Sequence, residues 1–192
     1  MRKLFAALLL ITGLVLIGMS AWQFIDTKRE QTKSMQKATT ILGKSKETPV
    51  PREQFQPAKN DTIGILHIPK IDAELPIVEG TKAEDLKKGV GHYTSTALPG
   101  DHNQILLSGH NDTVFRRFGE LEKGDEFIVE LPYGTFRYKM DHSKIVSADD
   151  TTIIQPTKPN EVLNLSTCYP FRYVGSTPDR YIIYAYPVEE TK

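Results

Sequence analysis

The sequence predicts a mainly β domain carried on an N-terminal membrane helix, and three observations support this. Residues 1–25 contain a long uncharged, apolar run, and residues 26–60 are polar and basic without a sustained apolar period. From Asp61 onward, seven or eight short apolar stretches alternate with turns rich in Gly and Pro. This last pattern is typical of a closed β-barrel or a β-sandwich with small helical insertions. Periodicity alone leaves both architectures open.

The apolar run covers residues 4–25, which are 22 residues without a charge. As a helix it would rise about 33 Å, enough to cross a hydrocarbon core of roughly 30 Å. Trp22 lies near its end, where membrane helices carry interfacial aromatic residues. A cleaved signal peptide is the alternative, because Met19-Ser20-Ala21 loosely resembles a cleavage site, but signal peptides usually have a shorter apolar region of ~7–15 residues. We expect an uncleaved single-pass anchor.

Residues 26–60 are expected to form a basic stalk. Thr32 to Leu42 has the composition of a short helix, whereas Pro and charged residues from Gly43 onward favour an extended linker. The stalk holds eight basic and four acidic residues, and residues 61–192 hold 14 basic and 20 acidic residues. The zero net charge of the chain therefore averages a basic stalk and an acidic domain. This balance gives no reason to expect nucleic acid as a partner. We expect the stalk to lie against anionic lipid headgroups or wall polymers while the acidic domain stands off from that surface.

The elements of residues 61–192 follow from apolar runs and the residues that interrupt them. Pro69 stops a first strand, Glu79-Gly80 ends a second, and Gly89 closes one or two helical turns. Pro132-Tyr133-Gly134 is typical of a hairpin turn between the fourth and fifth strands. The predicted strands cover residues 63–68, 71–78, 104–108, 126–131, 136–140, 162–168 and 181–186, with the helical turns over 83–88.

The single cysteine, Cys168, is the first candidate for chemistry. A lone Cys excludes an intramolecular disulfide and a multi-cysteine metal site. Cys168 ends an apolar run and precedes Tyr169-Pro170, so it is predicted at a strand end, where reactive groups are often presented. A buried structural thiol is the alternative. A thiol with an ordinary pKa of about 8.5 is mostly protonated at neutral pH, so a nucleophilic Cys needs a basic or electropositive neighbour.

Among the five histidines, His110 is the strongest candidate for that neighbour. It follows the buried strand Ile105-Leu106-Leu107 directly, in the segment Ser108-Gly109-His110-Asn111-Asp112, and Gly109 permits close backbone approach. His67 and His142 interrupt or end strands and are expected to be structural. His92 and His102 fall in Gly-rich loops that can line a cleft.

Two arginines follow the cysteine and are candidates for stabilising transition-state charge. Arg172 lies in a loop, whereas Arg180 opens the strand Tyr181-Ile182-Ile183-Tyr184 and would be held by the sheet. A rigidly held guanidinium is the better partner for an oxyanion, and a solvated surface charge is the alternative for either residue. The sequence shows no compact carboxylate cluster with ligand spacing, so no metal or other cofactor is expected.

Several motifs together resemble the sortases, the Gram-positive cysteine transpeptidases that attach proteins to the cell wall. Asn164-Leu165-Ser166-Thr167-Cys168 is similar to the family signature Thr-Leu-x-Thr-Cys, with Asn164 in place of the first Thr. The segment from Ser108 to Phe118 resembles the family's catalytic-histidine segment. The regions around Cys168-Tyr169-Pro170-Phe171 and Asp179-Arg180-Tyr181-Ile182 look most like the class D branch found in bacilli. The resemblance covers residues 63–186.

This resemblance implies an eight-stranded β-barrel with short helices over residues 61–192. It also implies a cell-membrane protein whose N-terminus is cytoplasmic and whose catalytic domain is extracellular, although the basic residues that flank the span leave the topology open. The implied roles are Cys168 as nucleophile toward an LPxT-type sorting signal, His110 as general acid and base, and Arg180 as oxyanion partner. The implied acceptor is an amine on a peptidoglycan precursor such as lipid II.

Four further residues are predicted to contact substrate: Asn111, Asp112, Ser166 and Thr167. The loop from Ser147 to Pro159 is expected to bind the Leu-Pro part of the signal. Two other functions remain open from the sequence. One is a cysteine peptidase that only hydrolyses such signals, and the other is an anchored binding module that has lost catalysis.

Overall fold

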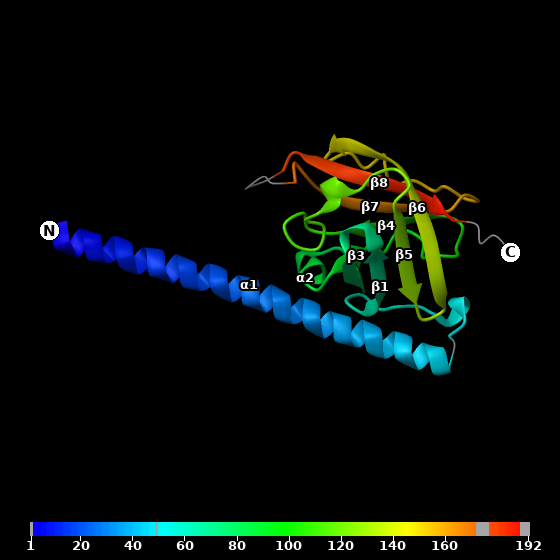
Figure 1. Cartoon of the computed structure of the whole chain (residues 1–192), viewed down its shortest axis with the longest axis horizontal. Coiled ribbons are helices and arrows are strands. Elements are labelled where there is room, and N and C mark those ends of the chain that lie inside the picture. The colour runs from blue at the N-terminus through cyan, green and yellow to red at the C-terminus, as the bar shows by residue number, and fades with distance from the viewer. Residues whose placement is uncertain (1, 49, 172–176, 189–192) are drawn as a thin grey trace.

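The computed structural model describes residues 2–48, 50–171 and 177–188. Eight strands close into a barrel in the spatial order β1-β2-β3-β4-β7-β8-β6-β5 (Figure 1). The strands are β1 (Thr62–Ile68), β2 (Ala73–Glu79), β3 (Val90–His92), β4 (Gln104–Ser108), β5 (Glu126–Leu131), β6 (Gly134–Ser147), β7 (Val162–Tyr169) and β8 (Asp179–Pro187). The helices are α1 (Arg2–Glu47) and α2 (Ala83–Leu86), with single 3-10 turns at Arg52–Gln54, Pro69–Ile71 and Phe118–Glu120. The barrel with short helices is confirmed, and the sandwich is excluded.

The barrel contains one strand that the sequence pattern did not predict. β3 has only three residues, and its central Gly91 breaks any alternation of apolar side chains. A side chain at Gly91 would meet the Gly80 carbonyl oxygen at 2.3 Å, so this short strand lies very close to the end of β2. The β6 strand is also longer than expected and continues to Ser147 past an irregularity between Met140 and His142.

The Glu161 carboxylate accepts three hydrogen bonds at one end of the apolar barrel interior. Tyr138 is fully buried and donates a hydrogen bond of 2.7 Å to one carboxylate oxygen of Glu161. The other oxygen accepts the backbone N–H groups of Gly100 and His102 at 2.9 and 3.0 Å. Burial and the bond to Glu161 raise the pKa of Tyr138 far above its usual value, so the phenol stays a donor. Glu161 directly precedes β7, so these bonds fix the loop before β4 to the start of β7.

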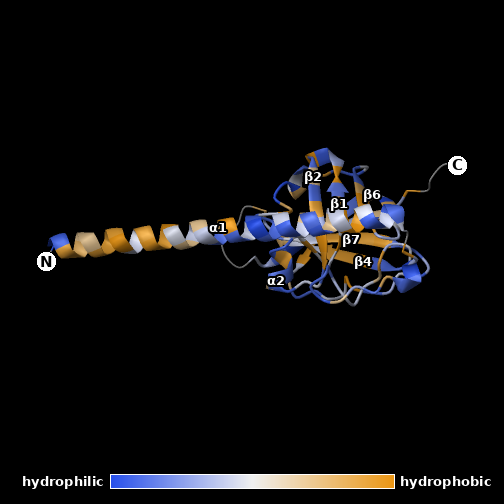
Figure 2. Ribbon diagram, turned by 90° about the horizontal axis from the view of Figure 1, so that it is seen from below, coloured by the Kyte–Doolittle hydropathy of each residue, from blue (hydrophilic) through white to orange (hydrophobic). Residues whose placement is uncertain are grey.

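The helix α1 is continuous and has two distinct halves. Its N-terminal half is apolar and exposed, whereas its C-terminal half is polar outside and lies along the barrel (Figure 2). Within the described residues, α1 is the one helix long and apolar enough to cross a membrane by length and composition. It is therefore a candidate transmembrane span.

The second half of α1 packs on the outside of β1. Ser34, Ala38 and Leu42 recur every four residues and are buried, and Ala38 and Leu42 contact Ile65. The Ser34 and Thr62 hydroxyl oxygens lie 3.0 Å apart. The expectation of an extended linker from Gly43 onward is wrong for residues 43–47, which continue the helix because this packing and the helix-forming neighbours offset the cost of about 1 kcal/mol for one glycine. Residues 50–61 contain no helix beyond the turn at Arg52–Gln54. The second half of α1 is therefore part of the folded domain and not a free stalk.

Introducing a charge into this interface is expected to release α1 from the barrel. Ala38 is 0% exposed, so the Ala38→Glu variant would bury an unpaired carboxylate, and undocking the helix is the cheaper outcome. We expect limited proteolysis of residues 26–60 to accelerate by roughly tenfold or more while the near-ultraviolet circular dichroism of the barrel is retained. The exposed neighbour Thr39→Glu is the matched control. Equal cleavage of the two variants would contradict the docking.

Candidate active site

The register between β4 and β7 brings two predicted site residues to the same end of the barrel. The strands are parallel, and Ser108 pairs with Ser166. His110 and Cys168 each lie two residues farther along, so His110 follows the carboxyl end of β4 and Cys168 is the penultimate residue of β7. The antiparallel strand β8 adds a third residue, since Cys168 pairs directly with Arg180. Three segments far apart in sequence thus meet at one rim.

Side-chain alternation places Cys168 on the outer face of the barrel. Leu163, Leu165 and Ile183 belong to the buried core, and residues of that parity point inward. Cys168 has the opposite parity and is a half-buried free thiol. Its partner Arg180 shares this face because paired residues of adjacent strands project to the same side. Complete burial, the alternative that the sequence left open, does not apply.

Three hydrogen bonds fix the segment of His110 to the end of β7. The Thr167 hydroxyl donates to the Gly109 carbonyl at 2.7 Å, and the Gly109 N–H donates to the Ser166 carbonyl at 3.0 Å. The Asn111 amide donates to the Pro170 carbonyl at 3.2 Å. A side chain at Gly109 would lie 2.7 Å from Phe115 and from Val114, so glycine is required where the segment after β4 folds back on itself. The bonds hold His110 beside the strand that carries the thiol.

The guanidinium of Arg180 is held from one side by nearby backbone. Its Nη1 donates to the Asp179 carbonyl at 2.9 Å and to the carbonyl and hydroxyl oxygens of Thr177 at 3.4 and 3.3 Å. No carboxylate within the residues that the structure describes pairs with it. Its charge is therefore available to a carbonyl or anionic oxygen near Cys168. Arg172, the other arginine that the sequence raised, lies outside the described residues.

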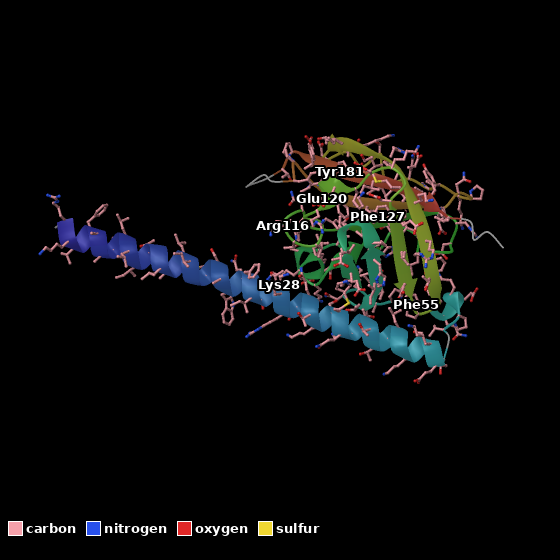
Figure 3. The ribbon with its side chains drawn as sticks, viewed as in Figure 1. Lys28, Phe55, Arg116, Glu120, Phe127 and Tyr181 are labelled. Carbon is pink, nitrogen blue, oxygen red and sulfur yellow. The ribbon has the colours of Figure 1, made fainter. Side chains whose placement is uncertain are left out.

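An aromatic cluster closes the barrel beneath this rim. The ring of Phe171 lies 5.4 Å from that of Tyr169 and 5.1 Å from that of Tyr181, both in edge contact. A side chain at Gly119 would lie 3.2 Å from Phe171, so the turn at Phe118–Glu120 passes close to the same ring. Figure 3 shows Tyr181 and Glu120 next to each other at this end of the molecule. The cluster supports the segment that leaves Cys168.

Two buried amides hold the connection between β6 and β7 against the outer face. Gln104 is 5% exposed; its Nε2 donates to the Ile153 carbonyl at 2.6 Å and to Asn164 Oδ1 at 2.8 Å. Gln104 Oε1 accepts the Gln155 N–H at 2.9 Å. Asn164, the residue that departs from the sortase signature, also donates to the Ile183 carbonyl at 3.3 Å. Sequence reasoning missed Gln104, although a polar residue opening an apolar strand was a visible signal.

The remaining predicted contact residues fall into two groups. Ser166 is half-buried on the outer face. At the rim, Asn111 is half-buried and Asp112 is exposed. Thr167 is 2% exposed and points to the opposite side from Cys168. Its hydroxyl is already bonded to Gly109, which leaves little of the side chain to meet a substrate.

The other histidines are held by structural contacts or lie at a loop. The expectation that His92 lines a cleft is wrong: it lies in β3, is 2% exposed, and its Nδ1 is 2.7 Å from the Glu79 carboxylate. His142 stacks on Tyr184, with ring centroids 4.5 Å apart. His67 is half-buried between two glutamates, and His102 is exposed at a positive φ of 53°. Within residues 2–48, 50–171 and 177–188, no group of three or more acidic, His or Cys side chains could hold a metal.

Removing the Thr167 hydroxyl is expected to loosen the contact between the two catalytic-site segments. The Thr167→Val variant keeps the shape but leaves the buried Gly109 carbonyl without its donor, so the free energy of unfolding should fall by about 1–2 kcal/mol. Thr167→Ser retains the donor and is the control. Denaturant unfolding measures both, and a loss in Thr167→Ser as large as that in Thr167→Val would show that the bond contributes nothing.

Removing the Gln104 amide is expected to free the connection over residues 148–161. The Gln104→Leu variant leaves the Ile153 carbonyl and the Gln155 N–H unpaired, at a cost of about 1–3 kcal/mol. Hydrogen exchange at residues 153–157 should accelerate while exchange in β5 stays unchanged. Gln104→Glu keeps the acceptor for Gln155 and should give an intermediate rate. Unchanged exchange in Gln104→Leu would contradict this role.

Comparison with known proteins agrees with the barrel fold. The family model described as a sortase domain matches residues 66–188. Sortase D of Bacillus subtilis (strain 168) is 47% identical over an aligned stretch of 193 residues, and the match covers 96% of this chain and 98% of that protein. A Clostridium perfringens Sortase D5 transpeptidase has a TM-score of 0.70 at 24% identity, over 83% of this chain and 99% of that one.

A second solved structure is the Clostridium perfringens sortase C with the C-terminal cell wall sorting motif. Its TM-score is 0.64 at 26% identity, and the match covers 84% of this chain and 89% of that one. The family model spans most of the barrel, and the Bacillus relative is similar along nearly the whole chain, anchor region included. The chain therefore belongs to the sortase family of cysteine transpeptidases.

Proposed function

We propose that this chain is a membrane-anchored sortase that cleaves an LPxT-type C-terminal sorting signal and joins the protein to an amine of a peptidoglycan precursor. The observation that carries the proposal is the register that gathers His110, Cys168 and Arg180 at one rim of a sortase-family barrel. Each residue type suits one requirement of acyl transfer: a thiol nucleophile, a proton carrier and a fixed cation.

In the first half-reaction, the Cys168 thiolate attacks the Thr carbonyl carbon of the signal, and the carbonyl oxygen becomes an oxyanion beside Arg180. The C–N bond then breaks, and the leaving amine takes a proton from the His110 imidazolium. The product is a thioester on Cys168 and a free C-terminal fragment. Arg180 suits its role because Asp179 and Thr177 hold one side of the guanidinium and no described carboxylate neutralises it.

In the second half-reaction, the acceptor amine attacks the thioester carbonyl and gives up a proton to His110. The C–S bond breaks, the Cys168 thiolate leaves, and an amide joins the protein to the acceptor. A lipid II-like precursor supplies such an amine. The reaction needs no cofactor, because every proton and electron pair passes between the peptide, the amine and these side chains.

The donor is expected to lie on the outer face, between Cys168 and the connection that Gln104 holds. Ser166 faces this side two residues before the thiol, and Asn111 and Asp112 directly follow His110. Residues 147–159 would contact the Leu-Pro part of the signal. The sortase C solved with the C-terminal cell wall sorting motif supports this donor class.

The apolar half of α1 supports a location in the cell membrane. Residues 4–25 would span the bilayer once, with the N-terminus in the cytoplasm and the barrel outside a Gram-positive-type cell. That side holds both wall precursors and exported proteins.

Single-residue variants of the full chain in lipid nanodiscs test the assignment with an LPxT-type peptide library and added amines. Cys168→Ala is expected to abolish ligation, because no thioester can form. His110→Ala should lower kcat by roughly 10²- to 10⁴-fold and Arg180→Ala by roughly 10²- to 10³-fold. Lys139→Gln, exposed on β6, is the control and should match the unaltered chain. Mass spectrometry identifies the products.

The products also separate the proposal from its two rivals. A ligated peptide in the unaltered chain supports transpeptidation, and cleaved peptide alone with every amine indicates a hydrolytic cysteine peptidase. Peptide binding without turnover, equal in the unaltered chain and Cys168→Ala, indicates an inactive binding module. Ligation retained in Cys168→Ala would exclude Cys168 as the nucleophile.

A further inference from the structure

The contact between α1 and α2 relates the barrel to the end of the apolar span. Asp26 is the first charged residue after residues 4–25, and its carboxylate lies 3.4 Å from the Lys87 ammonium. Lys87 directly follows α2. Because α1 is one helix through Glu47 and packs on the barrel at Ser34, Ala38 and Leu42, no flexible joint separates the span from the domain. The distance of α2 from the end of the apolar span is therefore fixed by α1.

That height coincides with the polar layer of a bilayer. The headgroup region is about 5–7 Å deep on each side, and a helix rises about 1.5 Å per residue, so this layer covers the first four or five residues after a span. Lys28 and Arg29 lie in that stretch of α1. Lys87 lies at the same level, because its ammonium contacts the Asp26 carboxylate.

The rim that carries α2 is also the rim of the candidate active site. α2 leads into β3, which pairs antiparallel with the end of β4 through Gly91 and Ser108. The segment from His110 onward therefore leaves the barrel on the side of α2. Figure 1 shows α2 at the end of the barrel nearer the N-terminal half of α1, and Figure 3 shows Arg116 at a similar level to Lys28 along the molecule.

The exposed charges of this rim differ from those of the rest of the domain. Residues 61–192 hold 14 basic and 20 acidic residues. The exposed basic residues of the rim are Lys82, Lys87, Arg116 and Arg117, and its exposed acidic residues are Glu84, Asp112 and Glu120. Arg117 pairs with Glu120 at 2.7 Å and Lys87 pairs with Asp26, so Lys82 and Arg116 are balanced by Glu84 and Asp112. The exposed Lys28 and Arg29 of α1, at the same level, make this end of the molecule basic and turn it toward an anionic surface.

We propose that this rim, formed by residues 82–87 and 111–117, rests on the anionic phospholipid headgroups of the membrane that holds α1. The docked rim places the openings next to His110 and Cys168 toward the bilayer. This inference rests on the proposed anchoring of residues 4–25, and it goes beyond anchoring because it assigns a lipid-binding surface to the barrel itself.

Nitroxide labels on the full chain in nanodiscs test the proposal. In a Cys168→Ala background, labels would be placed by Glu84→Cys and Thr113→Cys on the rim and by Lys46→Cys at the far end of α1. A lipid with a nickel-chelating headgroup reports proximity to the membrane surface. In discs that contain phosphatidylglycerol, both rim labels should be relaxed strongly and the label at residue 46 weakly. Leu14→Cys is the control for insertion and should contact oxygen dissolved in the hydrocarbon.

Charge reversal tests which lipid the rim binds. Lys82→Glu combined with Arg116→Glu is expected to lower the docking equilibrium in phosphatidylglycerol discs by roughly 25-fold or more, because each basic residue near an anionic surface contributes about a factor of five. Lys139→Glu, exposed on β6, is the matched control and should leave docking unchanged. Discs of phosphatidylcholine alone should show weak relaxation at both rim labels.

Three results would overturn the proposal. If the label at residue 14 contacts oxygen in the hydrocarbon but the rim labels are relaxed as weakly as the label at residue 46, the anchor stands and the docking is excluded. Equal relaxation in the two kinds of disc would exclude recognition of anionic lipid. A label at residue 14 outside the hydrocarbon would contradict the anchor itself, and the docking with it.

Discussion

The parallel pairing of β4 with β7 is the constraint on which the candidate site depends. Ser108 opposite Ser166 sets the position of everything that follows either strand. Because side chains alternate along a strand, a shift of one residue would turn Cys168 toward the core and Thr167 outward. Parallel neighbours also require a long crossover, and β5 and β6 form part of it. Those two strands close the barrel while β4 and β7 deliver the histidine and the thiol to one rim.

The hydrogen bonds around this pairing divide into two sets with different tasks. On the inner side, Thr167 and Gly109 join the two segments that carry His110 and Cys168. On the outer side, Gln104 and Asn164 hold a loop over the face that the thiol shares. Neither set uses the reacting groups themselves. The buried polar groups of the strands therefore position the site, and neither the Cys168 thiol nor the Arg180 guanidinium is used in these bonds.

Local patterns located seven of the eight strands and raised His110, Cys168 and Arg180 as candidates among others, whereas the resemblance to sortases singled out these three residues and favoured the barrel over the sandwich. Apolar runs bounded by Gly and Pro located seven strands, and the residues that follow buried strands included His110 and Cys168. The pattern failed where structure depends on distant partners. β3 is too short to alternate, and His92 is buried only because Glu79 of β2 pairs with it. The continuation of α1 past Gly43 likewise depends on β1, since only packing against Ile65 makes its stripe of small and apolar residues a buried face.

The unbroken helix α1 couples the height of the barrel to its direction. Each residue of an α-helix adds about 1.5 Å of rise and about 100° of rotation. One residue inserted between Asp26 and Ser34 would raise the barrel by only about 1.5 Å but would rotate it by about 100° around α1, which would move Lys87 away from Asp26. Four inserted residues would lift it by about 6 Å and nearly restore its direction. The number of residues in this stretch of helix therefore sets how far the thiol stands from the bilayer and whether Lys87 meets Asp26 at the end of the span.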